Sequence, residues 1–253
     1  MRLIDSHVHL DGLGDAEGAL VRAREAGLVG IVAVGGSIQS SEMALAAAER
    51  HRGFVFAGVG VHPSEALKVG VDEAVAYASS HAFKTVVIGE IGLDYAYGWA
   101  RPPEVRERMR TLYEALLAVA EGNRLPVSVH SRSAYGDALR LVKGRELPGA
   151  VFHWYDGPLQ TLKEILDGGY YVSATPAAAY SKGHKAVVSE APLERLLVET
   201  DSPVLLRGEG RVSEPADVAL TVRAVARIKG LEPEEVARVS SRNAETLFRL
   251  PPV

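Results

Sequence analysis

The sequence of 253 residues predicts a single (β/α)8, or TIM, barrel. Short apolar runs alternate with helical stretches along the chain, which is typical of a parallel sheet covered by helices. About eight such units fill the length, as a barrel requires. No long linker, low-complexity tract or block of charge divides the chain, so we predict one domain over residues 1–253. A dinucleotide-binding sheet is disfavoured because no Gly-x-Gly-x-x-Gly turn follows the first strand.

Eight apolar runs are expected to form the strands. They are short and continuous, which indicates burial on both faces rather than on one. In order, the predicted strands cover residues 3–4, 29–34, 54–59, 85–88, 126–129, 150–152, 170–173 and 196–198.

The helices are predicted from their caps and periodicity. Asp15 and Gly27 bound the first helix, over 16–26, as a possible N-cap and a stop. Asp72 is expected to cap a helix that runs to residue 80. The other predicted helices cover 40–52, 104–122, 134–142, 159–166, 183–190, 216–229, 233–239 and 243–248.

Composition excludes several classes of protein. The net charge of −4 gives no basic excess for long nucleic-acid contacts. Without cysteine there is no disulfide framework and no thiolate metal site. No apolar run reaches the roughly 20 residues of a membrane helix, and the first strand begins too early for a signal peptide. We expect a cytoplasmic protein; monomer is compatible with the sequence, and the oligomeric state stays open.

His7 and His9 close the first strand and suggest a metal site. Residues two apart on a strand point to the same face, so both imidazoles are directed together. Two histidines so placed can hold a divalent ion, although unrelated histidines at a strand end share this spacing.

Ligand-type residues also end five other predicted strands. Because the carboxyl ends of barrel strands open onto one face, these side chains should converge there. His51 and His81 are interpreted as surface residues near helix ends, and His184 is left unassigned. The converging residues are His62, Glu90, His130, His153 and Asp201.

Six of these residues can surround two metal ions. His7, His9 and Asp201 would hold one ion and His130 and His153 the other, with Glu90 bridging. Two metals roughly 3.5–4 Å apart suit phosphate-ester hydrolysis, because they activate a water and stabilise charge on the attacked and leaving oxygens. Zn, Mn and Mg are all candidates, and histidine-rich ligation favours Zn or Mn.

The chain resembles, nearly end to end, the TatD family of metal-dependent deoxyribonucleases within the amidohydrolase-like barrels. The glutamate stretch and the Glu-Thr-Asp-Ser-Pro stretch are the specific ones. The matching stretches are residues 5–11, 60–63, 89–95, 125–132, His153, 197–203 and 242–248.

The resemblance implies a function and its residues. It implies metal at the six residues named above, with Asp201 and Glu90 as catalytic carboxylates, and hydrolysis of DNA phosphodiesters, often from a 3′ end. We expect single-stranded or frayed DNA ends as substrate, cleaved by a water activated by the two metals. His62 and Arg132 match positions near the substrate phosphate; a capped strand end and a surface ion pair are their alternatives. Glu199 is either a residue that orients a ligand or a structural buried acid.

Departures from the family pattern affect substrate choice rather than the metal set. The family usually has His-Cys-Phe-Ser-Gly where residues 153–157 stand, and glutamines in the helix after the fourth strand. Trp154 and Tyr155 could each stack on a base or be buried beside the barrel rim, and the sequence does not decide between the two. The departing residues are Trp154, Tyr155, Asp156, Met109 and Leu116, with Gly122 and the loop 207–211.

Two other functions remain open. An amidohydrolase acting on a small amide or ester is one, although many such barrels place a carbamylated lysine where Glu90 stands. A non-enzymatic barrel that binds a ligand is the other, and a complete set of buried ionisable groups argues against it.

Overall fold

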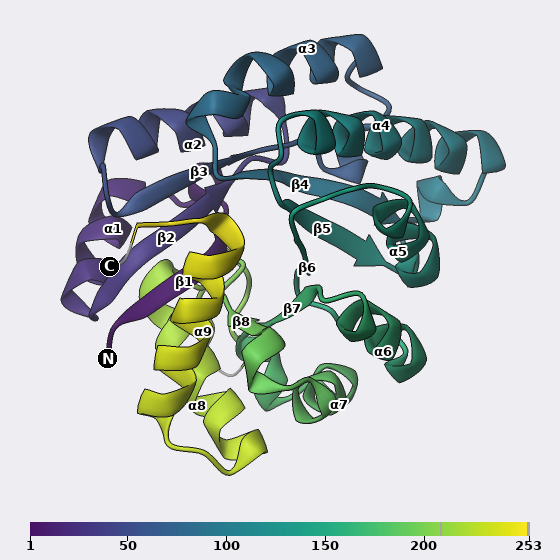
Figure 1. Ribbon diagram of the computed structural model, residues 1–253. Coiled ribbons are helices and arrows are strands. Elements are labelled where there is room, and N and C mark those ends of the chain that lie inside the picture. Colours follow the sequence, from purple (N-terminus) through teal and green to yellow (C-terminus); the bar gives the residue numbers. More distant parts are fainter. Residues whose placement is uncertain (208, 252–253) are drawn as a thin grey trace.

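The computed structural model describes residues 1–207 and 209–251, and its centre is one sheet of eight parallel strands (Figure 1). Neighbours in the sheet follow sequence order from β1 to β8. The strands are β1 (Leu3–Val8), β2 (Leu28–Val34), β3 (Val55–Val59), β4 (Val87–Asp94), β5 (Val127–Arg132), β6 (Ala150–Phe152), β7 (Tyr171–Ala174) and β8 (Leu196–Val198).

The first strand meets the segment after the last one, which brings the sheet close to a closed barrel. The amide of His9 donates to the carbonyl of Ser202 at 2.8 Å, and the amide of Asp201 donates to that of His7 at 3.0 Å. Val8 and Ser202 form a parallel bridge. The predicted (β/α)8 fold is confirmed.

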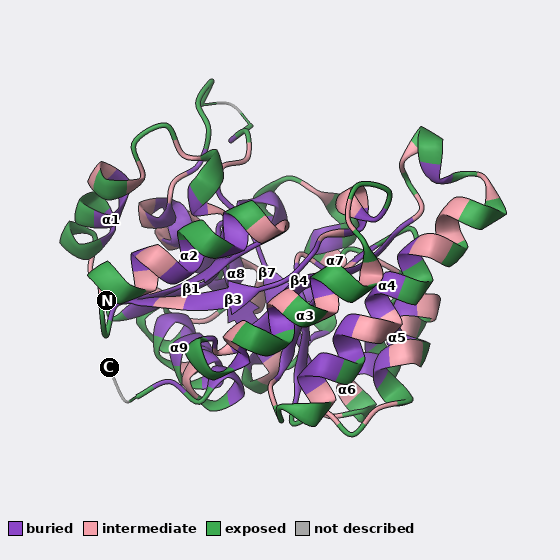
Figure 2. Ribbon diagram, turned by 90° about the horizontal axis from the view of Figure 1, so that it is seen from above, coloured by how far each residue is buried: buried purple, intermediate pink, exposed green. Residues whose placement is uncertain are grey.

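Helices follow the strands and cover the outside of the barrel. Figure 2 shows buried strands inside and helices whose exposed residues face outwards. The helices are α1 (Ala16–Glu25), α2 (Ile38–Arg50), α3 (Val71–His81), α4 (Pro103–Gly122), α5 (Tyr135–Lys143), α6 (Leu159–Asp167), α7 (Lys182–Glu190), α8 (Val218–Lys229) and α9 (Pro233–Phe248).

Helix α9 packs against the amino-terminal ends of β1 and β8. Ser241 Oγ donates to the carbonyl of Arg2, and Asn243 Nδ2 donates to the carbonyls of Leu193 and Leu196. Phe248 joins a buried apolar cluster with residues of several strands. Each large apolar side chain buried there contributes about 1.5–3 kcal/mol. This end of the barrel is therefore covered, and the carboxyl-terminal end is left for a site.

Several predicted elements have different bounds in the structure, and the differences that matter for the site and its support are these. Asp72 lies inside α3, whose N-cap is Gly70. The two helices predicted over 233–239 and 243–248 are one helix, because tertiary contacts of Ser241 and Asn243 outweigh the weak helix propensity of that segment. The fourth strand runs on to Asp94, so Glu90 lies within the strand.

Among the described residues, no helix is both long and apolar enough to span a membrane.

Candidate metal centre

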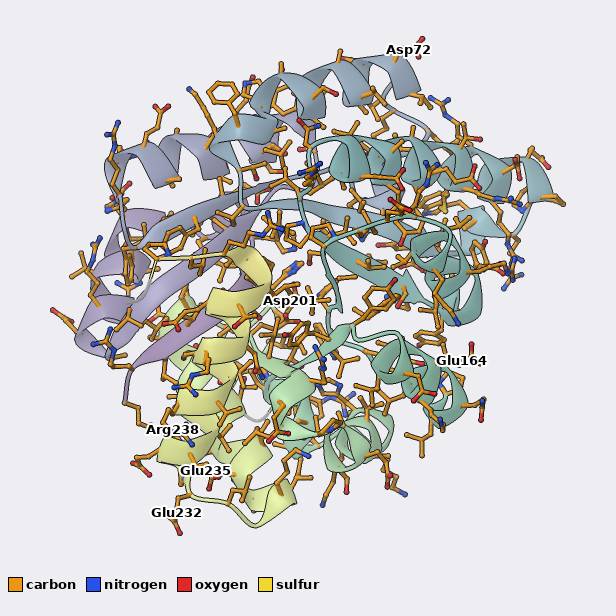
Figure 3. The ribbon with its side chains drawn as sticks, viewed as in Figure 1. Asp72, Glu164, Asp201, Glu232, Glu235 and Arg238 are labelled. Atoms are coloured by element: carbon orange, nitrogen blue, oxygen red, sulfur yellow. The ribbon has the colours of Figure 1, made fainter. Side chains whose placement is uncertain are left out.

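All six predicted metal ligands lie at the carboxyl-terminal end of the barrel. His7, Glu90 and His130 belong to β1, β4 and β5. The other three follow strand ends, His9 after β1, His153 after β6 and Asp201 after β8. In Figure 3, Asp201 lies near the middle of the ring of strands, whereas Asp72, Glu164 and Glu232 lie at the periphery.

The carboxylate of Glu90 is the centre of the cluster. It is 3% exposed and is surrounded by imidazoles on both oxygens. This is the arrangement that a bridging carboxylate needs, since each oxygen faces a separate group of donors. Oε1 lies 2.7 Å from His153 Nε2, 2.8 Å from His130 Nδ1 and 3.7 Å from His62 Nε2, and Oε2 lies 3.3 Å from His9 Nε2 and 3.8 Å from His7 Nε2.

Asp201 faces the first pair of histidines. Its Oδ1 lies 3.4 Å from His9 Nε2 and 3.6 Å from His7 Nε2. The residue has a φ of 51°, a left-handed conformation in which Asp is more frequent than most residues. The amide of the preceding Thr200 donates to Asp5, and its hydroxyl donates to the same carboxylate at 2.6 Å. These bonds fix the backbone that carries Asp201.

His153 is oriented by Glu199. Its Nδ1 lies 3.4 Å from Glu199 Oε1, which leaves Nε2 directed at Glu90. The same Glu199 oxygen accepts from the amide of Trp154 at 3.0 Å, where the backbone takes a φ of 40°. Of the two alternatives for Glu199, this geometry favours the orienting role, because a carboxylate on the distal nitrogen fixes both tautomer and ring.

Asp94 is a member of the site that the sequence reasoning did not assign. Its Oδ2 lies 2.9 Å from His130 Nε2 and accepts from Arg132 Nε at 2.8 Å. Asp94 lies four residues after Glu90 on the same strand, a spacing that places both side chains on one face. That spacing was the available signal. Arg132 is thus tied to the centre through Asp94.

The charges of the centre compensate one another. Burial opposes ionisation of Glu90, but the neighbouring histidines, His62 first among them, hold its pKa well below the usual value. Burial likewise opposes the charge on Asp201, and hydrogen bonding to His9 lowers its pKa. For His9, burial is outweighed by Asp201 and Glu90, which raise its pKa to about 10. His62, by contrast, has its pKa lowered by burial to about 4. Two anionic carboxylates held among imidazoles form a site suited to cations.

The donor set fits divalent metal ions. His7, His9 and Asp201 offer ligand atoms within 4.8 Å of one another, as do His62, Glu90 and His130. A further such group is His7, His153 and Glu199. Imidazole nitrogens with carboxylate oxygens are the ligands of Zn and Mn in proteins lacking cysteine. The geometry adds His62, expected only near the substrate, to the possible ligands.

A cavity of about 730 Å³ opens above the cluster. The residues after β6 that depart from the family pattern are used in two ways. Trp154 and Asp156 line the cavity, whereas Tyr155 is buried and its hydroxyl donates to the carbonyl of Pro158. Met109 and Leu116 are buried in the core through α4 and do not line the cavity. Its other lining residues include Tyr97, Arg132, Tyr180, Lys182 and Arg207, which are exposed or half-exposed and form its mouth.

The three remaining histidines lie outside the centre. His51 contacts Glu17 at 2.8 Å near the end of α2, and His81 ends α3. His184 is fully buried: it accepts from the amide of Thr175, and its other nitrogen contacts the carbonyl of Tyr155 at 2.9 Å. Burial lowers the pKa of His184, which indicates a neutral structural residue.

An α/β barrel with a buried histidine–carboxylate cluster at the carboxyl ends of its strands defines a metal-dependent hydrolase of the amidohydrolase-like class. The family model described as TatD related DNase matches residues 4–249, and the chain belongs to that family. The recognition made from the motifs is confirmed, and the protein is a metal-dependent hydrolase of the TatD type.

Relatives and solved structures agree along nearly the whole chain. Deoxyribonuclease TATDN3 of Homo sapiens is 31% identical, over 97% of this chain and 94% of its own. The 3'-5' ssDNA/RNA exonuclease TatD of Edwardsiella piscicida is 31% identical, over 94% of each chain. The crystal structure of YJJV, a TatD homologue from Escherichia coli K12, superposes with a TM-score of 0.89 at 29% identity, covering 98% of both chains.

Proposed function

We propose that this protein is an exonuclease that hydrolyses phosphodiester bonds at single-stranded or frayed DNA ends, with two divalent metal ions. The observation that carries the proposal is Glu90, whose two oxygens face two groups of histidines at the floor of a cavity with cations at its mouth. The names of the relatives from Homo sapiens and Edwardsiella piscicida support a nuclease and the 3′ to 5′ direction. A single domain over residues 1–253 belongs to the proposal, supported by the one sheet that all eight strands share.

In this proposal, His7, His9 and Asp201 would hold one ion, His130 and His153 would hold the other, and Glu90 would serve both. Bound metals supply Lewis acidity, which lowers the pKa of a water and neutralises charge on a phosphodiester. The Asp201 carboxylate would accept the proton of the attacking water as the water oxygen bonds to phosphorus and the phosphorus–oxygen bond to the departing nucleotide breaks. That proton would then pass to the departing oxygen. The pKa of Asp201 is lowered despite burial, so the carboxylate is free to accept that proton at neutral pH.

Residues around the ligands keep them in place. Glu199 and Asp94 accept from His153 and His130 and fix both rings. Arg132, whose Nε is held by Asp94, projects its guanidinium at the cavity as a phosphate ligand. Lining the same cavity, Trp154 offers a ring for a base to stack on.

A substrate panel tests the function. We expect the metal-loaded enzyme to degrade single-stranded DNA from its 3′ end, with weaker action on blunt duplex, and to lose activity in EDTA and regain it with Zn or Mn. The panel includes RNA, a 3′-blocked strand, and small amides and esters. Turnover of an amide or ester without any cleavage of nucleic acid would replace this function with the amidohydrolase alternative.

The salt dependence of binding tests how the strand is held. In the loop 207–211, Arg211 is bound by Asp217 at 2.7 Å and Glu209 at 2.8 Å and does not line the cavity. Arg132, Lys182 and Arg207 line it. Each neutralised phosphate contributes about −0.7 to the log–log salt slope for a single strand, so two or three contacts predict a slope of roughly −1.5 to −2.

The measurement uses a labelled single strand and metal-loaded, catalytically inactive protein across a salt series. Arg207→Ala should make the slope shallower by about 0.7, whereas Arg211→Ala should leave it unchanged. A slope near −4 for the parent, which corresponds to about six contacts, would indicate a basic surface outside the cavity.

A further inference from the structure

The mouth of the cavity carries two arginine–tyrosine pairs. The guanidinium carbon of Arg132 lies 4.6 Å from the ring centre of Tyr97, and that of Arg207 lies 5.0 Å from the ring centre of Tyr180. All four residues line the cavity. An arginine over a tyrosine ring offers a phosphate ligand and a stacking surface side by side, which are the two groups that a nucleotide needs.

The two pairs lie on different sides of the metal centre. Tyr97 follows β4 and Arg132 is the last residue of β5, whereas Tyr180 and Arg207 follow β7 and β8. Because the strands follow sequence order around the barrel, the pairs are three strands apart. Trp154, which follows β6 and also lines the cavity, lies between them in that order. A single-stranded nucleic acid that contacts both arginine–tyrosine pairs therefore crosses the mouth of the cavity.

The pairs differ in their counter-charges. Arg132 already donates to the buried Asp94, and through it contacts the ligand His130. In the described part of the chain, by contrast, neither Arg207 nor Lys182 makes an ion pair with a carboxylate.

Helix α7, which begins at Lys182, does not compensate the positive charge of that lysine. Lys182 is the first residue of α7, and the first turn of that helix has no acidic residue. A lysine at the positive end of a helix dipole is unfavourably placed. A bound anion would offset the repulsion between Lys182 and the helix dipole, and it would supply the counter-charge that Arg207 and Lys182 lack.

We infer that Tyr180, Arg207 and Lys182 form a second nucleotide subsite, which holds a nucleotide of the same strand away from the bond being cleaved. The inference rests on the proposed function. A base stacks on Tyr180, whose side chain is 41% exposed, and the adjoining phosphate is bound by Arg207 and Lys182. The substrate class that follows is a single-stranded polynucleotide, in preference to a small phosphodiester, because only a strand reaches both the metal centre and this subsite.

The test compares two substrates in Tyr180→Ala and Arg207→Ala. One is a short single-stranded oligodeoxynucleotide, and the other is bis(4-nitrophenyl) phosphate, which has no second nucleotide. Stacking predicts that Tyr180→Ala raises KM for the oligonucleotide roughly 5- to 150-fold. We expect unchanged turnover of the small diester and nearly parental KM in Tyr180→Phe, which keeps the ring. Arg207→Ala should also raise KM for the oligonucleotide.

A matched control removes an aromatic–cation pair from another part of the surface. Phe83 is 81% exposed, and Lys84 Nζ lies 5.8 Å from its ring centre, in the turn that precedes β4 at the opposite end of the barrel. Phe83→Ala and Lys84→Ala, made separately, remove a ring and a positive charge as Tyr180→Ala and Arg207→Ala do. They should leave both substrates unaffected.

The outcomes separate the subsite from the function. If the parent cleaves the oligonucleotide and Tyr180→Ala keeps its KM within twofold, the subsite is wrong while the nuclease function stands. An equal loss on both substrates would show a disturbed metal centre and would also overturn the subsite. If the parent hydrolyses the small diester but no oligonucleotide under any metal, the proposed function fails, and the subsite fails with it.

Discussion

Asp201→Asn is expected to lower kcat on single-stranded DNA at least ~100-fold, the lower limit for loss of general acid–base catalysis. The amide has the shape of the carboxylate but no charge, and it accepts a proton poorly. Asp201 Oδ1 lies within 3.6 Å of Nε2 of both His7 and His9, so in the proposed site the change also weakens a metal ligand. The measurement is kcat at neutral pH with saturating metal, alongside circular dichroism and metal content.

The control for this change is Asp167→Asn. Asp167 is the last residue of α6, where it pairs with Lys163 on the surface, and the substitution removes the same charge. It should leave kcat unaltered. If Asp201→Asn keeps the parental fold and a rate within a few-fold of the parent, Asp201 is not the base.

Glu90→Gln is expected to remove metal binding as a whole. One carboxylate oxygen faces His153 and His130 and the other faces His9 and His7, so losing the charge weakens both groups of ligands. Residues that only orient a ligand contribute 10- to 100-fold to metal affinity, so a bridging ligand should contribute more than ~100-fold. Activity should fall with the metal.

His130→Ala provides the contrast, because it takes a ligand from one group only. Metal content by mass spectrometry should fall from the proposed two ions to less than one in Glu90→Gln, and toward one in His130→Ala. Glu164→Gln, on the outer helix α6, is the matched control, and it should retain full content and activity (Figure 3). Full metal content in Glu90→Gln would contradict the bridging assignment.

The burial of Glu90 among histidines predicts that metal binding depends on pH. The charge of Glu90 is stable only because surrounding histidines hold its pKa well below the usual value despite burial. Metal binding must therefore displace protons from imidazoles such as His9, whose pKa is raised to about 10. Affinity for metal should weaken as the pH falls, since protons compete for the same nitrogens.

The sequence by itself determined the barrel and the position of the proposed metal ligands along it. Each ligand lies at the carboxyl end of a short apolar run, and parallel strands direct all those ends to one face. That rule depends only on strand direction, so His7 on β1 and His130 on β5, far apart in sequence, could be placed together.

Tertiary structure decided how the neighbours of the ligands are used. Trp154 and Tyr155 are adjacent aromatic residues, yet one lines the cavity and the other is buried. The difference arises from the left-handed backbone at Trp154, whose amide donates to Glu199 and Ser173. Those acceptors come from other strands, so no local pattern reveals them.

The same reason explains why the contacts at the mouth of the cavity could be found only in the structure. Tyr180 and Arg207 lie in loops after different strands, and no periodic pattern precedes their contact. Strand order and burial follow from local hydrophobicity, which can be read along the chain. Loop contacts depend on which strand ends the closed barrel brings together, and that is a property of the whole fold.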